Sequence, residues 1–201
     1  MSKVQSIIFD LDRTLVHLSI DWGKVVSRIE DLLGVEFKSL LELFTRIWDT
    51  EKFEVVSRTI EEYELASLSQ LEFLDASPEL LRDLSSKYRL GVVTFQGANV
   101  TRIIIEKLGI QGVPIATRDD DATRIGQIKL ILSNVQLHAT EVLVIGDKLN
   151  DVYSALELGC NAVLIDRQNF YDPNRHGSGF TVISNLKGLP TLLSSGIFSS
   201  E

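Results

Sequence analysis

The stretch IIFDLDRTL at residues 7–15 and the stretch VLVIGDKLND at residues 142–151 decide how this chain is interpreted. Each begins as an apolar run typical of a buried strand and ends in two carboxylates. The carboxylates are Asp10 and Asp12 in the first stretch, and Asp147 and Asp151 in the second. Four carboxylates at the ends of buried strands are costly to bring together without a cation. Mg²⁺ prefers oxygen ligands, usually carboxylates together with substrate phosphate. The two stretches therefore predict a metal-dependent phosphate site.

The composition is ordinary for a globular protein and sets limits on partners. The chain has 201 residues, of which 44% are hydrophobic and 24% charged, and its net charge is −8. That negative charge argues against nucleic acid or a membrane surface as a partner. Cys160 is the only cysteine, which excludes an intramolecular disulfide and a thiolate zinc cluster. The first residues lack the apolar region of a signal peptide, so we expect a cytoplasmic protein.

The first apolar run and the region from residue 77 onward together show two patterns, one typical of strands and one of helices. Apolar runs that predict strands occur at residues 4–9, 90–95, 113–116, 142–145, 162–165 and 180–183. Helical patterns occur at residues 77–88, 98–108, 127–135, 151–158 and 185–193. Buried strands that alternate with helices are typical of a parallel sheet covered on both faces. We therefore predict an α/β fold with a doubly wound parallel sheet.

A different pattern separates the first strand from this alternating region. Three amphipathic helical stretches are expected at residues 22–33, at residues 40–48 and from residue 54 to about residue 74. No strand-like segment is evident between them. We therefore predict a small all-helical cap at residues 16–76, inserted into a core formed by residues 1–15 and 77–201.

The predicted topology brings the polar residues to one edge. In open parallel sheets, ligands bind outside the carboxyl ends of the strands. Asp10, Asp12, Thr94, Asp147 and Asp151 all lie at the carboxyl ends of predicted strands. Since residues two apart on a strand share a face, Asp10 and Asp12 can both address one phosphate.

These motifs resemble those of the haloacid dehalogenase superfamily of phosphatases, phosphomutases and related hydrolases. Residues 9–15 resemble its first motif, residues 92–94 its second and residues 146–151 its fourth. The expected helical insert resembles the family's cap, and the layout is most similar to the phosphoglycolate phosphatase and β-phosphoglucomutase branch. Arg13 stands where the family most often has glycine.

The resemblance implies a role for each residue of these motifs. Asp10 would be the nucleophile that forms an aspartyl-phosphate, and Asp12 the general acid and base. Mg²⁺ would be held by Asp10, by the backbone carbonyl of Asp12 and by Asp147. Asp151 would either ligate the metal or hold the metal ligands in position. The Thr94 hydroxyl would donate a hydrogen bond to a phosphate oxygen.

The family's third motif, a lysine often followed by proline, has no clear counterpart here. Lys129 lies closer to Asp147 than is usual, whereas the spacing of Arg124 is nearer to the family's. Because Lys129 could reach back along its helix, we expect it to neutralise the phosphate, with Arg124 as the alternative.

Other conspicuous residues receive plainer interpretations. Asp119, Asp120 and Asp121 are interpreted as a solvated loop, and Trp22 as a packing residue of the cap. Cys160 is expected to be a small buried residue.

The expected activity is Mg²⁺-dependent hydrolysis of a small phosphorylated metabolite, similar to that of a phosphoglycolate phosphatase. Two alternatives stay open: a phosphomutase of the same superfamily, and a non-enzymatic binding or regulatory protein on a degenerate scaffold. The sequence identifies neither the substrate nor the oligomeric state, so a monomer and a dimer are both compatible with it.

Overall fold

The core of the molecule is a parallel sheet. A computed structural model describes residues 4–198 of the chain, and within them six strands form one sheet in the order β5-β4-β1-β6-β7-β8. The strands are β1 (Ser6–Asp10), β4 (Arg89–Val93), β5 (Ile115–Ala116), β6 (Val142–Gly146), β7 (Asn161–Ile165) and β8 (Thr181–Ile183). All neighbouring pairs in this sheet are parallel. The predicted α/β fold is thereby confirmed.

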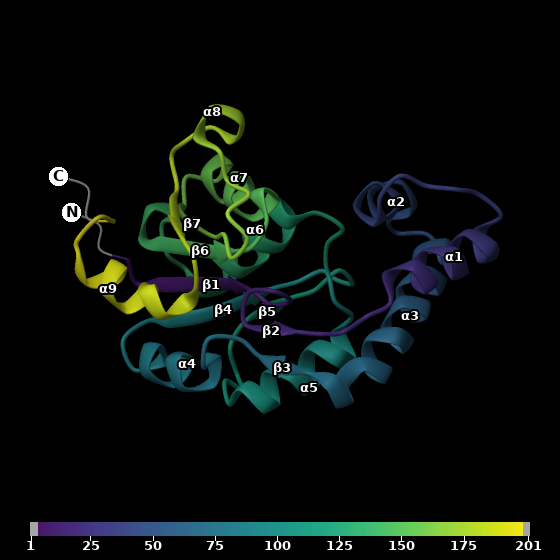
Figure 1. Ribbon diagram of the computed structural model, residues 1–201, viewed down its shortest axis with the longest axis horizontal. Coiled ribbons are helices and arrows are strands. Elements are labelled where there is room, and N and C mark those ends of the chain that lie inside the picture. Colours follow the sequence, from purple (N-terminus) through teal and green to yellow (C-terminus); the bar gives the residue numbers. More distant parts are fainter. Residues whose placement is uncertain (1–3, 199–201) are drawn as a thin grey trace.

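Helices cover both faces of the sheet (Figure 1). They are α4 (Ser77–Ser85), α5 (Ala98–Leu108) and α9 (Leu189–Ser194) on one face, and α6 (Arg124–Val135) and α7 (Leu149–Glu157) on the other. Successive side chains of β1 point to opposite faces of the sheet. Ile7 and Phe9 pack against the α4, α5 and α9 side, and Ile8 packs against the α6 and α7 side. This double burial explains why the central strands are continuous apolar runs. Three short helical segments are η2 (Ala139–Glu141), α8 (Pro173–His176) and η3 (Leu186–Gly188).

Three helices between β1 and α4 form a separate small core. They are α1 (Trp22–Leu33), α2 (Leu40–Ile47) and α3 (Glu51–Ala66). Their buried side chains, among them Val25, Leu43 and Val56, pack with one another. Each helix begins at a side-chain cap, formed by Asp21, Ser39 and Thr50 in turn. Thr50 explains why α3 begins earlier than the sequence suggested.

The expectation that no strand interrupts the insert is wrong. A two-residue strand β2 (Val16–His17) pairs antiparallel with β3 (Glu72–Phe73), and the short helix η1 (Ser67–Gln70) precedes β3. Segments of two residues show no periodicity, so the sequence pattern does not reveal them. The ladder holds the two connections of the helical insert side by side.

The helical insert coincides with the predicted cap segment, and the division at residues 16–76 stays a prediction. The predicted core also includes residues 1–3 and 199–201, which lie outside the described residues. Among residues 4–198, no helix is long and apolar enough to cross a membrane.

Candidate active site

The polar residues gather where the central strands end. Asp10 is the last residue of β1, which lies between β4 and β6. Thr94 follows β4, and Asp147 follows β6. Asp151 lies in the first turn of α7. One carboxylate oxygen from each of Asp10, Asp147 and Asp151 lies within 4.8 Å of the other two. The topology thus brings together residues more than a hundred positions apart in the chain.

Asp10 has both carboxylate oxygens engaged by neighbours. The Thr14 hydroxyl donates to Oδ2 over 3.0 Å, and Arg124 Nη2 donates to Oδ1 over 2.6 Å. Burial raises the pKa of Asp10 well above its usual value, because desolvation outweighs the attraction of Arg124 and the other aspartates add repulsion. The sequence had not assigned a role to Thr14, although it lies four residues after Asp10 in the same motif.

Arg124 is the cation of this cluster. Its side chain is buried, and its Nη1 donates to Gln127 Oε1 over 2.8 Å. Arg124 Nε lies 2.7 Å from Asp151 Oδ1 as an ion pair, although its N–H does not point at that oxygen. The guanidinium carbon also lies 4.6 Å from the centre of the Phe95 ring. Arg124 therefore links Asp10, Asp151 and the loop after β4.

The preference for Lys129 as the cation beside Asp10 is wrong, because its side chain is exposed on α6. Successive helix residues are rotated by about 100°, so a residue five positions after Arg124 lies roughly 140° around the axis. Gln127 and Ile128, three and four positions after Arg124, share its buried face. The alternative residue, Arg124, is the one that contacts Asp10.

Asp12 lies at the edge of the cluster. Its side chain is half-buried, and Oδ1 accepts from the Leu18 backbone N–H over 3.1 Å and lies 3.9 Å from His17 Nδ1. Burial raises the pKa of Asp12 despite these favourable neighbours. A carboxyl whose pKa is raised and which lies partly open to solvent suits proton transfer.

Asp147 and Asp151 differ in how they are held. Asp147 is half-buried, burial raises its pKa, and Lys148 Nζ lies 3.3 Å from its Oδ2. Asp151 is buried, and its Oδ2 accepts from the Lys148 backbone N–H over 3.1 Å. A side chain at position 146 would place its Cβ only 2.1 Å from Asp151 Oδ2, so the glycine there lets the carboxylate approach the end of β6.

Thr94 is positioned through its backbone and through Gln127. Its N–H donates to Ala116 O over 2.9 Å, and its carbonyl accepts from Gln127 Nε2 over 3.1 Å. Thr94 Oγ1 accepts from the Gln96 N–H over 3.1 Å, which leaves the hydroxyl proton to point elsewhere. Gln127 thus holds both Arg124 and Thr94, and its place three residues after Arg124 on the same helix face was the signal that could have identified it.

The donor set fits a hard divalent cation. Asp10, Asp147 and Asp151 offer only carboxylate oxygens, and each oxygen has lone pairs beyond those used by its present partners. The cluster, with Asp12 beside it, faces one buried guanidinium and one exposed lysine. Negative charge therefore exceeds positive charge at the site, and a bound Mg²⁺ would correct that imbalance.

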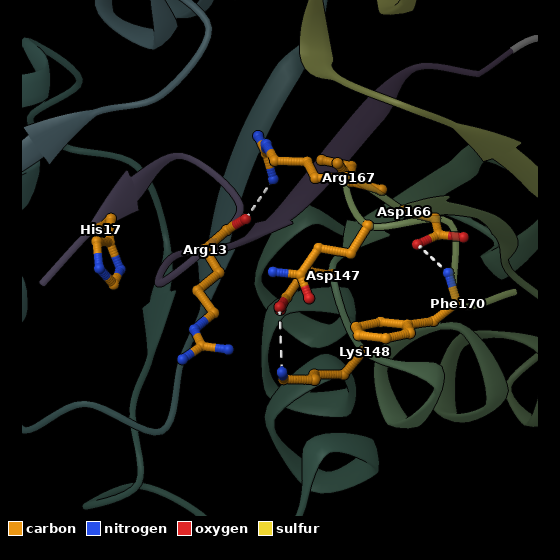
Figure 2. A pocket seen from close by; sticks show the side chains of 9 residues that line it. Arg13, His17, Asp147, Lys148, Asp166, Arg167 and Phe170 are labelled. Atoms are coloured by element: carbon orange, nitrogen blue, oxygen red, sulfur yellow. Dashed lines mark hydrogen bonds and ion pairs between the residues drawn. The ribbon is translucent and has the colours of Figure 1, made fainter. Parts of the chain in front are cut away.

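A cavity of about 350 Å³ opens beside Asp147 (Figure 2). Basic side chains around it include Arg13, His17, Lys148 and Arg167. Arg167 is held in place because its Nη2 donates to Thr14 O over 3.2 Å and to Asp75 Oδ2 over 2.5 Å. Arg13, at φ +60°, turns the chain directly after Asp12. The cavity has the size and charge to admit a small anionic molecule to the cluster.

The acidic run at residues 119–121 forms a loop in which Asp119 and Asp120 are exposed, as expected, but all three carboxylates also accept hydrogen bonds. Asp119 accepts from the Ser57 hydroxyl on α3 over 2.6 Å and from the Ala98 N–H on α5 over 2.9 Å. Asp120 accepts from the Thr117 N–H over 2.8 Å, and Asp121 from the Thr123 N–H over 2.7 Å. The sequence pattern predicts the solvent exposure of this loop, but it cannot reveal the hydrogen bonds of Asp119 to α3 and α5.

Comparison with known proteins identifies the family of this chain. The family model for haloacid dehalogenase-like hydrolases matches residues 7–165. No curated protein matches the chain. The chain belongs to the haloacid dehalogenase-like hydrolases, as its motifs suggested.

Solved structures share the fold across nearly their whole length. A hydrolase from Pseudomonas syringae superposes with a TM-score of 0.72 at 21% identity, covering 95% of this chain and 98% of that one. A predicted phosphoglycolate phosphatase from Haemophilus somnus gives 0.67 at 18% identity, with coverage of 96% and 99%. A magnesium-bound hydrolase of the same family from Bacillus subtilis gives 0.62 at 13% identity, with coverage of 95% and 99%. At these identities the likeness concerns the fold alone.

Proposed function

We propose that this protein is a Mg²⁺-dependent phosphatase that hydrolyses a small phosphorylated metabolite through an aspartyl-phosphate on Asp10. The observation that carries the proposal is the environment of Asp10. It ends the central strand, Thr14 and Arg124 fix its carboxylate, and Asp147 and Asp151 complete a carboxylate cluster beside it. A nucleophilic carboxylate, a fixed cation and a metal-binding cluster are what phosphoryl transfer requires.

The metal would be held by Asp10, the backbone carbonyl of Asp12, Asp147 and Asp151. When bound, Mg²⁺ supplies positive charge that screens the repulsion between the phosphate and the carboxylates. Arg124 adds fixed positive charge from the buried side, and Thr94 offers its hydroxyl proton to a phosphate oxygen.

The residues divide the reaction into two steps. In the first, an Asp10 oxygen attacks phosphorus, the bond between phosphorus and the leaving oxygen breaks, and Asp12 gives that oxygen a proton. In the second, Asp12 takes a proton from water, the water oxygen attacks phosphorus, and inorganic phosphate leaves as the Asp10 carboxylate is restored. The partly open position of Asp12 suits both proton transfers.

Hydrolysis of p-nitrophenyl phosphate tests this function. We expect activity with Mg²⁺, none with EDTA, and none in Asp10→Asn. Asp83→Asn, an exposed aspartate on α4, is the matched control and should retain full activity. Hydrolysis that persists in Asp10→Asn would contradict the proposal.

A further inference from the structure

A second, smaller cavity lies between the helical insert and the core. Its volume is about 140 Å³, and its walls are entirely apolar or aromatic: Trp22, Leu40, Leu41, Phe44, Ile60 and Phe95. Five of these residues belong to α1, α2 and α3. Phe95 belongs to the loop that follows β4 and lies next to Thr94.

The cavity wall is not simply part of the insert's own core. Phe44 and Ile60 in the wall are buried members of that core, whereas Trp22 keeps 37% and Leu41 40% of its surface exposed. Large apolar side chains left open around a cavity are typical of a binding site rather than of packing. The interpretation of Trp22 as a packing residue is therefore incomplete.

Phe95 connects this cavity to the candidate active site. Its ring centre lies 4.6 Å from the guanidinium carbon of Arg124, and Arg124 Nη2 lies 2.6 Å from Asp10 Oδ1. One side chain therefore forms a wall of the apolar cavity and also contacts the cation beside the nucleophile. The chain of contacts from the cavity to the nucleophile therefore runs through two side chains, Phe95 and Arg124.

The size and chemistry of the cavity select its occupant. An engineered apolar cavity of about 150 Å³ in another protein stays dry and binds benzene. Here the volume is about 140 Å³, and a sugar hydroxyl or a carboxylate would lose its hydrogen bonds to water against these walls. Resting on the proposed phosphatase function, we infer that the substrate is a phosphate monoester whose organic part ends in a phenyl-sized hydrocarbon group, which binds in this cavity.

Two substrates that differ only in that group test the inference. The ratio of kcat/KM for 2-phenylethyl phosphate to that for ethyl phosphate isolates the ring, because both leaving groups are primary alcohols. Burial of a phenyl side chain contributes about 2 kcal/mol, which corresponds to a ratio of about 30. Equal kcat/KM values would overturn the inference and leave the phosphatase function intact.

A pair of leucine variants locates the effect. Leu41→Asn places an amide in the cavity wall and should lower the ratio about fivefold or more. Leu32→Asn changes a leucine of similar exposure on α1 that does not line the cavity, and should leave the ratio unchanged. An equal effect of both variants, or of neither, would contradict the assignment.

A binding measurement separates this inference from the proposed function. In a Trp48→Phe background, Trp22 is the single remaining tryptophan, so it alone gives the tryptophan fluorescence. Added 2-phenylethanol should shift the emission maximum of Trp22, and the shift should saturate as the concentration rises. That shift should disappear in Leu41→Asn and persist in Leu32→Asn. If p-nitrophenyl phosphate and both of these esters are left unhydrolysed, the phosphatase function fails. In that case, the inferred binding of a phenyl-sized group is supported if the Trp22 emission shifts in this pattern. The inference is overturned if the emission does not shift.

Discussion

Asp10 depends on two neighbours, each of which contacts a different oxygen of its carboxylate. Thr14 donates to one oxygen, and Arg124 contacts the other while it also pairs with Asp151. Since all of these groups are buried, each interaction is stronger than it would be in water, and each loss is costly.

The contrast between Arg124 and Lys129 gives a prediction. Arg124→Ala should lower kcat at least about a hundredfold, because it removes the fixed cation beside the nucleophile. Lys129→Ala, with an exposed side chain on the same helix, should change kcat less than about twofold. Steady-state kinetics with p-nitrophenyl phosphate measures both, and the reverse order would contradict the assignment of the cation.

Cys160 offers a prediction that is independent of activity. Its side chain is buried, and burial raises the pKa of its thiol from 9.0 to about 11. At pH 8 this gives about a hundredfold less reactive thiolate than an unperturbed thiol. A thiol reagent should therefore label the folded protein at least a hundredfold more slowly than the unfolded protein in denaturant. Equal rates would show that Cys160 is accessible.

At the residue scale, the sequence predicts the positions of side chains that directly end a strand with a clear apolar pattern. Asp10 and Asp147 could be predicted because buried strands fix where their carboxyl ends lie. Arg124 could not be chosen over Lys129, because motif spacing says nothing of which helix face turns inward. The rotation of α6, decided by the packing of Ile128 and Ile131 under the sheet, settles that question.

Among the elements, α3 and α5 are joined by carboxylates. The first N–H groups of α5 lack a local side-chain cap, because Gly97 stands at its N-cap. Glu61 on α3 accepts from the Asn99 N–H over 2.7 Å, and Asp119 accepts from the Ala98 N–H over 2.9 Å. The helical insert thus supplies part of the cap of a core helix.

A fully buried ion pair strengthens the same junction. Arg118 Nη1 lies 2.6 Å from Glu64 Oε1, and its guanidinium also donates to the Ser57 and Phe95 carbonyls. Glu64 accepts from the Gly97 N–H over 3.0 Å as well. This network ties α3 to the loops after β4 and β5, and it anchors the insert beyond its two chain connections.

Glu64→Gln tests the importance of that network. The change leaves the buried Arg118 without a counter-charge, and it should lower the free energy of unfolding by about 3 kcal/mol. Glu62→Gln, two residues away and exposed, should change it by less than about 0.5 kcal/mol. Urea denaturation gives both values, and similar values for the two variants would show that the pair contributes little.

The order of strands and helices could be predicted, because alternation and periodicity extend over whole elements. The β2–β3 ladder and the junction of α3 with α5 could not. The first is too short to show a period, and the second depends on contacts between residues far apart in sequence.

At the scale of the whole molecule, the proposed phosphate site lies at the carboxyl ends of the central strands, and the apolar cavity lies between the helical insert and the core. The core strands supply the residues of the phosphate site, and α1, α2 and α3 supply most of the cavity wall. Phe95 lines the apolar cavity and also contacts Arg124 beside the phosphate site. The core would therefore determine the reaction, and the insert the organic group of the substrate.

Metal binding should stabilise the whole chain. Mg²⁺ at a hundred times its Kd adds about 2.7 kcal/mol to the folded state, which should raise Tm by about 5 °C or more. Asp147→Asn should abolish this shift, and Asp83→Asn should retain it. Thermal unfolding with and without Mg²⁺ measures the effect, and a full shift in Asp147→Asn would remove Asp147 from the metal site.

The most direct test of the central claim is a rapid-mixing experiment on Asp12→Asn with p-nitrophenyl phosphate and Mg²⁺. Because p-nitrophenolate leaves without a proton, the first step should proceed, whereas the second lacks its general base. We expect a burst of about one equivalent of p-nitrophenolate per chain, followed by a stall. Peptide mapping after quenching should find the phosphoryl group on Asp10. Steady turnover without a burst, or a phosphoryl group on another residue, would contradict the account.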